Sequence, residues 1–242
     1  MNLEEWGREA QERVKASRVL LAGAGGLGAA TALYLLAAGV GAIRLVDNSR
    51  VGLTDLSHQV LYREQDLGKA KAAAAERRLK EVNSFSAVES LVKVISPHNV
   101  SCLTSACQVL IDATNNAAAG LLLNQAAAKQ QIPLVHAAVW DLDGRVTTSW
   151  PGRSPCLSCL CQETSHPGRP SLLSPLSGIL GALLALEALR ILGGVGPALL
   201  GRVLYFHGTS LKFTEKLPKP SPTCPNCQNP RSKKLSEIKK SD

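Results

Sequence analysis

Two pairs of cysteines give the strongest chemical signal in the sequence, Cys156-Leu-Ser-Cys159 and Cys224-Pro-Asn-Cys227. Each pair offers two thiolates from one tight turn, and two such turns complete the tetrahedral four-sulfur site that structural zinc prefers. The long separation of the pairs suits a clamp that pins the end of the chain onto its body, and it leaves no ligand position open for catalysis. We therefore expect a zinc knuckle pair with four cysteine ligands; the alternative is four unrelated thiols.

The other cysteines are expected to be free thiols rather than disulfides, because nothing in the sequence indicates secretion. Cys102 and Cys107 lie beside a predicted strand and are expected in the core. Cys161 stands outside the two pairs, on a proline- and glycine-rich segment at residues 161–175 that is predicted to be a crossover loop. It is the cysteine best placed to act as a nucleophile, although nothing in the sequence shows that its pKa is lowered.

A glycine-rich loop, GAGGLG at residues 23–28, joins a predicted strand to a predicted helix. Gly23, Gly25 and Gly28 let the backbone approach a phosphate group, and the amino terminus of the helix offers free N–H groups. Asp47 ends the next strand, where an acid can bind ribose hydroxyls. The pattern predicts a nucleotide site without choosing between ATP and NAD. The alternative is that the glycines only allow close packing of helix and strand.

These residues must be positioned by alternating strands and helices. Short runs rich in Val, Leu and Ile predict strands at residues 18–23, 42–47, 108–113 and 133–138, and at the segment LVKVI. Longer alanine-rich patterns between them predict helices at residues 27–38, 69–82 and 117–129. The alternation predicts an α/β fold on a mainly parallel sheet, and RVTTSW and RVLYFHG further on predict an antiparallel extension.

Charge and hydropathy argue against nucleic-acid-binding, membrane and secreted proteins. The net charge is +8, but most of it lies after residue 211, and residues 228–242 are predicted to be a basic, disordered tail. We expect no specific nucleic-acid binding, since no basic motif is interleaved with aromatic residues. Residues 176–192 form the membrane candidate, yet Glu187 and Arg190 favour a buried helix and no membrane association. No leader precedes the fold, so a cytoplasmic location is expected.

Together these motifs resemble the ThiF/MoeB/HesA family, relatives of the ubiquitin-activating enzymes. The resemblance rests on WGREAQERVKASRVLLAGAGGLG, AAGVGAIRLVD, DLGKAK, PLSGILGALLALEALRILGG and YFHGTSLKF followed by PTCPNCQ, and it covers all but the last fifteen residues or so. It implies a Rossmann-like nucleotide-binding domain over residues 1–227, present as a homodimer or as a heterodimer with a related chain. Family members use Mg-ATP to adenylate the terminal carboxylate of a small β-grasp sulfur carrier or ubiquitin-like protein, and some then form a thioester or persulfide. The same architecture activates peptides in natural-product pathways.

The resemblance assigns roles to individual residues. Gly25 and Gly26 would hold phosphate, Asp47 would bind ribose, and Lys71 would reach the phosphates. Gln59 matches the glutamine that closes the family's Asn-Leu-x-Arg-Gln stretch. Without the resemblance, a lysine in an alanine-rich helix would be assigned to a solvated face.

The same alignment shows departures from the family. The stretch Ser-Asn-Leu-x-Arg-Gln is Thr54-Asp55-Leu56-Ser57-His58-Gln59 here, so that an asparagine has become Asp55 and a phosphate-binding arginine has become His58. In the stretch 112–116 the usual magnesium-binding aspartate is Asn115, beside Asn116, and the arginine that typically follows falls at Gly120. A further arginine, lent across the dimer, would align at or before Met1, and the family's downstream cysteine falls near Pro167.

Two of these changes are complementary, and we hypothesise that the magnesium-binding carboxylate has moved to Asp55, with Asn115 as its amide neighbour. The sequence thus predicts an ATP-dependent adenylyltransferase of a sulfur-carrier protein, with Cys161 as the remaining candidate for a sulfur-transfer step. The first rival is a catalytically impaired pseudoenzyme that binds a carrier or an active relative. The second rival, an NAD-dependent oxidoreductase, leaves GKAK and both cysteine pairs unexplained.

Overall fold

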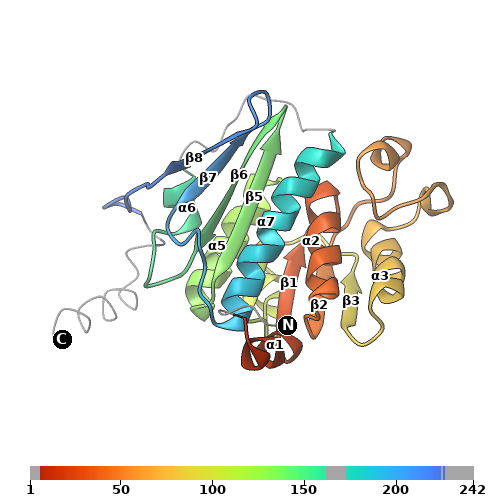
Figure 1. Ribbon diagram of the computed structural model, residues 1–242, viewed down its shortest axis with the longest axis horizontal. Coiled ribbons are helices and arrows are strands. Elements are labelled where there is room, and N and C mark those ends of the chain that lie inside the picture. Colours follow the sequence, from red (N-terminus) through yellow and green to blue (C-terminus); the bar gives the residue numbers. More distant parts are fainter. Residues whose placement is uncertain (1–5, 162–172, 225, 227–242) are drawn as a thin grey trace.

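A computed structural model describes residues 6–161, 173–224 and 226 (Figure 1). Cys227, the tail at 228–242 and most of the predicted crossover loop, including Pro167, lie outside the described residues.

The described chain is built on an eight-stranded sheet with the order β3-β2-β1-β4-β5-β6-β7-β8. The first five strands run parallel and the last three pair antiparallel, as the sequence predicts. Their bounds are Arg18–Ala22 (β1), Ala42–Val46 (β2), Ala87–Leu91 (β3), Val109–Asp112 (β4), Leu134–Trp140 (β5), Asp143–Ser149 (β6), Val203–His207 (β7) and Lys212–Lys216 (β8). β1 pairs with both β2 and β4, so the strand order reverses there, and ligands of such sheets bind at the carboxyl ends beside this point.

One strand prediction is wrong. The strand that pairs with β2 is Ala87–Leu91, and only the first residue of LVKVI belongs to it. Val92 and Val94 are 52% and 62% exposed, so this apolar run is not buried against the sheet. The hairpin strand β8 is an addition that the apolar pattern does not predict, because all of its residues are exposed.

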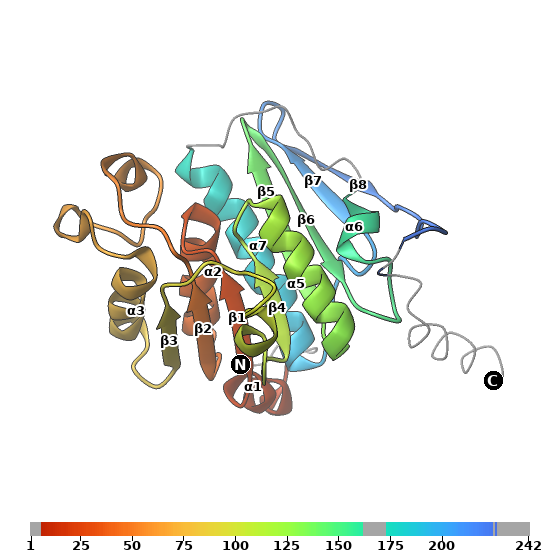
Figure 2. The same cartoon turned by 180° about the vertical axis from the view of Figure 1, so that it is seen from behind.

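The helices cover both faces of the sheet (Figures 1 and 2). On one face α2 and α7 lie side by side, and Gly181 of α7 makes this approach possible, since an added Cβ would lie 2.7 Å from the Leu27 carbonyl oxygen. On the other face α5 packs beside α6 (Figure 2). The bounds are Arg8–Lys15 (α1), Gly26–Ala37 (α2), Lys71–Val82 (α3), Val100–Leu103 (α4), Ala117–Gln130 (α5), Leu157–Leu160 (α6) and Ser174–Gly193 (α7).

The helix α7 is long and apolar enough to cross a membrane by length and composition, but more than half of its most apolar stretch is buried inside the fold. Its single carboxylate, Glu187, is buried and accepts hydrogen bonds from the Thr148 hydroxyl and from the backbone N–H groups of Ala198 and Leu199. These contacts tie α7 to the sheet and to the segment before β7. The helix is therefore a core element of the described fold, as the sequence predicts.

Candidate functional site

A cavity of about 360 Å³ lies where the sheet order reverses, at the carboxyl ends of β1, β2 and β4. We call it the nucleotide cavity, after the ligand that its sequence motifs predict. It is lined by Gly23, Gly25, Val46, Asp47, Asn48, Ser49, Lys71, Lys93, Val94, Ile95, Ala113, Thr114, Asn116, Ala118 and Ala119.

The glycines of the loop at residues 23–28 have different structural roles. Gly23 has a φ of +95° and Gly28 lies so close to it that an added Cβ would stand 1.9 Å from its carbonyl oxygen, so both are required by packing. A Cβ added to Gly26 would lie 2.8 Å from the hydroxyl oxygen of Ser177 on α7. Gly25 has only the Gln59 amide nitrogen near its Cβ position, at 3.9 Å. Gly25 is thus the position at which a missing side chain leaves room for a ligand, at the start of α2.

Asp47 directly follows β2, and backbone and side-chain groups of the neighbouring loops hold its carboxylate. One carboxylate oxygen accepts a hydrogen bond from the Ala24 N–H at 2.7 Å, and the other accepts from the N–H and hydroxyl of Ser49. Each carboxylate oxygen has two acceptor sites, so the group keeps capacity for a ligand hydroxyl. Its place in the nucleotide cavity agrees with the predicted ribose contact.

Lys71, at the start of α3, does not lie on a solvated face. Its side chain is 10% exposed, and Nζ lies 2.9 Å from Oδ1 of Asp55, which is itself 15% exposed. The same Asp55 oxygen accepts a hydrogen bond from Gln59 Nε2 at 2.6 Å, and Oδ2 accepts from the Gly52 N–H at 2.7 Å. Burial alone would raise the pKa of Asp55, but the Gly52 N–H and the Lys71 ammonium outweigh it and hold that pKa below its ordinary value.

His58 and Gln59 extend this network toward the glycine loop. Gln59 is buried, and its Nε2 lies 3.2 Å from His58 Nε2, while His58 Nδ1 is 3.4 Å from the Ser57 hydroxyl. The structure therefore brings Asp55, His58, Gln59 and Lys71 together on one side of the glycine loop. Of these four residues, Lys71 lines the nucleotide cavity.

The two asparagines after β4 point to different places. Asn116 is the N-cap of α5, and its Oδ1 accepts hydrogen bonds from the N–H groups of Ala118 and Ala119. Asn115 has a φ of +51°, a conformation that asparagine tolerates better than most residues. Its amide exchanges two hydrogen bonds with the backbone of Val139, at 3.0 and 3.2 Å. Asn115 is thus directed to β5, and Asn116 is the one that lines the nucleotide cavity.

A second cavity, also of about 360 Å³, lies on the other side of the start of α5. Asn116 lines both cavities. The lining of the second one is completed by Asn115, Ala117, Gly120, Leu121, His136, Ala138, Val139, Trp140, Arg145, Leu157, Ser158 and Cys161. The amino end of α5 thus stands between the two cavities.

His136 is the most constrained polar side chain of the second cavity. Its Nδ1 lies 2.9 Å from Oδ2 of Asp112, a fully buried carboxylate whose other oxygen accepts from the N–H and hydroxyl of Thr114. His136 Nε2 is buried and has no hydrogen-bond partner among the described residues. Leaving such a group unsatisfied costs about 1–3 kcal/mol, which points to a ligand or solvent molecule as its partner.

Cys161 lies at the end of α6 and is 4% exposed. Burial raises the pKa of its thiol to about 11, despite the opposing charge of Arg145. In this conformation the group is a protonated thiol at neutral pH. The other two unpaired cysteines differ, since Cys107 is buried as predicted and Cys102 is exposed, contrary to the prediction.

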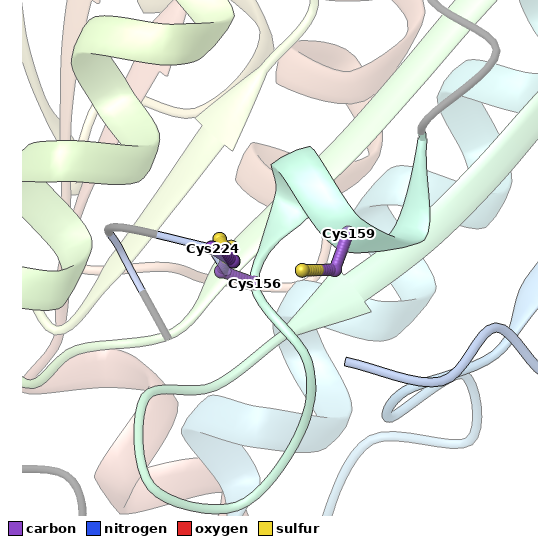
Figure 3. Close-up of side chains that lie close together, drawn as sticks. All are labelled: Cys156, Cys159 and Cys224. Atoms are coloured by element: carbon purple, nitrogen blue, oxygen red, sulfur yellow. The ribbon is translucent and has the colours of Figure 1, made fainter. Parts of the chain in front are cut away.

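Three of the four predicted metal ligands come together (Figure 3). The Sγ atoms of Cys156, Cys159 and Cys224 all lie within 4.8 Å of one another, and Cys156 and Cys224 are 3.5 Å apart. Sulfur ligands about 2.3 Å from a tetrahedral zinc ion stand about 3.8 Å from each other. The Ser221 N–H also points at Cys159 Sγ, at 3.3 Å. The donor set and its spacing therefore fit zinc, and the fourth predicted ligand, Cys227, is outside the described residues.

Sequence reasoning missed the second cavity and one lysine. His136 sits in the run PLVHAA, which predicts a strand, and a single polar residue among buried apolar ones was the signal that could have marked it. Lys93 lines the nucleotide cavity just after β3, inside the segment wrongly predicted to be a strand.

Comparison with known proteins identifies relatives along nearly the whole chain. The ThiF family profile matches residues 1–229. The vegetative HesA protein of Trichormus variabilis is 36% identical over 227 residues, which are 93% of this chain and 86% of that one. The sulfur carrier protein adenylyltransferase of Thermus thermophilus is 34% identical over 238 residues, 94% of this chain and 88% of that one. The crystal structure of E. coli MccB with ATP superimposes with a TM-score of 0.81 at 22% identity, over 90% of this chain and 68% of that one, which confirms the Rossmann-like fold.

Proposed function

The chain belongs to the ThiF family, and on that premise we propose that it is an ATP-dependent adenylyltransferase that activates the terminal carboxylate of a small ubiquitin-like sulfur-carrier protein. The observation that carries the proposal is the nucleotide cavity, where Gly25, Asp47 and Lys71 meet at the switch point of the sheet. The Thermus relative is named for this activity. We infer a β-grasp carrier as the substrate, and sulfur transfer as the pathway, from the similarity to that relative.

In the proposed reaction the carrier carboxylate attacks the α-phosphorus of ATP. A bond forms between a carboxylate oxygen and that phosphorus, the bond from the phosphorus to the bridging oxygen breaks, and pyrophosphate leaves with its electron pair. The first N–H groups of α2, beyond Gly25, would stabilise the phosphates. Asp47 would hold the ribose, and the Lys71 ammonium would offset charge that develops on the leaving group.

Lys71 must exchange partners for this role. In the structure it is paired with Asp55, and a bound triphosphate offers several negative oxygens in place of one. We propose that nucleotide binding draws Lys71 from Asp55 to the phosphates, and the freed Asp55 oxygen would be available to hold a magnesium ion. This would give Asp55 the role of the family aspartate that is Asn115 here.

A pseudoenzyme is the second candidate, and specific residues favour it. The family arginines are His58 and Gly120 here, and a guanidinium that clamps phosphate through two parallel hydrogen bonds is not replaced by an imidazole. The Asn115 amide is occupied by the backbone of Val139. Such a chain would bind a carrier or an active relative without turning over ATP.

We also propose that Cys156, Cys159, Cys224 and Cys227 hold a structural zinc ion. The ion would join α6 to the segment after β8, two parts of the chain that are far apart in sequence. Cys161 would serve in a sulfur-transfer step only if its thiol became exposed and the pKa of that thiol fell. We therefore propose that the reaction ends with the acyl-adenylate as its product.

We expect a dimer, either of two copies or with a related chain. Apolar side chains on the outer faces of α2 and α7 support this, with Tyr34, Ile179 and Leu186 exposed by 55%, 38% and 53%. Analytical ultracentrifugation of the zinc-loaded chain tests it. A monomer over the micromolar range would contradict a homodimer.

The experiment that tests the function is exchange of labelled pyrophosphate into ATP, with β-grasp carriers from the same genome as substrates. The expected result is exchange that depends on one carrier and is abolished in Lys71→Met. Lys129→Met, which changes an exposed lysine at the end of α5, is the matched control and should leave exchange intact. Binding of a carrier without exchange would identify the pseudoenzyme.

A further inference from the structure

Lys93 has no role in the reaction just described, although it lines the nucleotide cavity. The described residues of that lining include two cations, Lys71 and Lys93, and one carboxylate, Asp47. We propose that Lys93 is a further binding residue for the nucleotide, and that its ammonium contacts the α-phosphate, which the carrier carboxylate attacks. The proposal rests on the proposed function, since it assigns one more residue to that reaction.

The ion pairs of the two lysines provide the first argument. Lys71 is paired with Asp55 at 2.9 Å, so its charge is compensated before a nucleotide arrives. The Lys93 side chain is exposed, and its ammonium has no ion-pair partner among the described residues. The family arginines that would add positive charge to this site are His58 and Gly120 here. Lys93 is therefore the positive charge of the described lining that a phosphate can meet without displacing a carboxylate.

The position of Lys93 on the edge of the sheet indicates which phosphate it meets. Asp47 directly follows β2, and Lys93 follows the neighbouring strand β3 by two residues. Neighbouring strands lie about 4.8 Å apart, so the backbone at Lys93 stands about one strand spacing from Asp47 and two from the glycine loop after β1. With the ribose at Asp47, the α-phosphate lies between that residue and the start of α2. The four-carbon stem of a lysine can carry the ammonium of Lys93 to this phosphate.

The outer phosphates belong to the other lysine. Lys71 and Gln59 share the same Asp55 oxygen, and the Gln59 amide nitrogen lies 3.9 Å from the Cβ position of Gly25. This places the Lys71 network beside the glycine loop and the start of α2, on the far side of that loop from Lys93. The two lysines would thus hold different ends of the triphosphate.

The chain after β3 is folded so that it faces the cavity. The Lys93 N–H donates to the Leu91 carbonyl oxygen at 3.0 Å, which closes a tight turn where the strand ends. Asn99 holds the following loop, because its Oδ1 accepts from the Ser96 N–H at 2.9 Å and its Nδ2 donates to the Val94 carbonyl oxygen at 2.8 Å. The loop therefore presents Lys93 and Val94 to the cavity in a fixed conformation.

An ammonium at the α-phosphate acts in the reaction as well as in binding. Attack of the carrier carboxylate places additional negative charge on the oxygens of that phosphorus, and Lys93 would offset it. The acyl-adenylate keeps the α-phosphate, whereas the two outer phosphates leave as pyrophosphate. Lys93 would therefore hold both ATP and the adenylate, and Lys71 would hold ATP and pyrophosphate.

The test compares ATP, AMP and adenosine as ligands of the full zinc-loaded chain by calorimetry. We expect Lys93→Met to weaken the binding of ATP and of AMP by a similar factor, about tenfold or more, and to leave the affinity for adenosine unchanged. Lys93→Arg keeps the charge and should restore most of the affinity. Lys71→Met should weaken ATP much more than AMP, because AMP lacks the outer phosphates.

The control variant is Lys129→Met, which should leave all three affinities unchanged. Lys93 is exposed, so its replacement carries little risk to folding. An unchanged affinity for AMP in Lys93→Met, or an affinity for adenosine that falls by the same factor, overturns the contact with the α-phosphate. Absence of nucleotide binding in the wild type overturns the proposed function and this contact with it, whereas a wild type that binds ATP and AMP as tightly as Lys93→Met overturns this contact alone.

Discussion

The ion pair between Lys71 and Asp55 leads to a quantitative prediction about nucleotide binding. If Lys71 leaves Asp55 to reach the phosphates, ATP binding must break this pair, and Asp55→Asn should make ATP bind more tightly in the absence of magnesium. The two charged atoms are 2.9 Å apart and their side chains are 10% and 15% exposed. A hydrogen bond to a charged group contributes about 1.5–3 kcal/mol. Since about 1.4 kcal/mol is a tenfold change in affinity, the expected gain is about 10- to 100-fold.

The same variant should respond differently to magnesium. If Asp55 takes the magnesium ion after Lys71 has left, addition of magnesium will strengthen ATP binding by a larger factor in the wild type than in Asp55→Asn. Calorimetric titrations with ATP in EDTA and in magnesium measure both effects on one preparation. Thermal melting in the same buffers shows whether the variant is folded.

Asp66→Asn is the matched control. Asp66 is also a buried carboxylate near the start of α3, and its ion-pair partners are Arg77 and Lys69 rather than a residue of the nucleotide cavity. It should leave ATP affinity unchanged in both buffers. Unchanged magnesium-free affinity in Asp55→Asn would refute the exchange of partners, and an equal gain in Asp66→Asn would show that the effect is not specific to Lys71.

Four further predictions concern other parts of the fold. Cys224→Ser should lower the zinc content and the melting temperature of the chain, and chelation should do the same to the wild type; a metal-free wild type of unchanged stability would contradict the clamp. Glu187→Ala should lower the free energy of unfolding by about 2–5 kcal/mol in urea titrations, because two backbone N–H groups lose their acceptor; a loss below about 0.5 kcal/mol would mean that water replaces it. Burial alone would raise the pKa of Asp66, but the Arg63 N–H and the Arg77 guanidinium hold that pKa below its ordinary 3.8. The stability that Asp66 contributes is therefore present above pH 3.8 and is lost as the pH falls through the lower pKa of the folded state. The difference in stability between wild type and Asp66→Asn should be large at about pH 6 and should shrink as the pH falls below 3.8. Cys161, with a pKa raised to about 11, should react with iodoacetamide more slowly at about pH 8 than exposed Cys102 and should still accelerate above about pH 9, and equal rates would contradict its burial.

The parallel core of the fold could be predicted from local pattern because its strands are buried on both faces. The runs at β1, β2, β4 and β5 are rich in Val, Leu, Ile and Ala, as such strands require, with Arg44 in β2 and His136 in β5 as internal polar exceptions. The edge of the sheet obeys a weaker rule. β3 is Ala87–Leu91, which alternates buried and exposed positions at its start, and the more apolar segment beside it lies outside the strand. A strand at the edge of the sheet has a neighbouring strand on one side alone. The local sequence does not show which strand will lie at the edge, so it does not predict which residues stay exposed there.

The site shows the same division. The glycine loop, Asp47 and the cysteine pairs are marked by residues that are close in sequence, and the structure brings the described members of each together. The different roles of the glycines in the loop at residues 23–28 could not be predicted from the sequence. Gly26 is required because Ser177 packs against it, and Ser177 lies on α7, far away in the sequence. The second cavity depends on Asp112, Gly120, His136 and Arg145 meeting from three strands and a helix. No spacing rule connects such residues.

The most direct test of the central claim is a calorimetric titration of the zinc-loaded chain with ATP in magnesium. We predict saturable binding at submillimolar ATP that is lost in Lys71→Met and kept in Lys129→Met. Absence of heat at millimolar ATP in the wild type, or binding that survives in Lys71→Met, would contradict the assignment of this cavity to ATP.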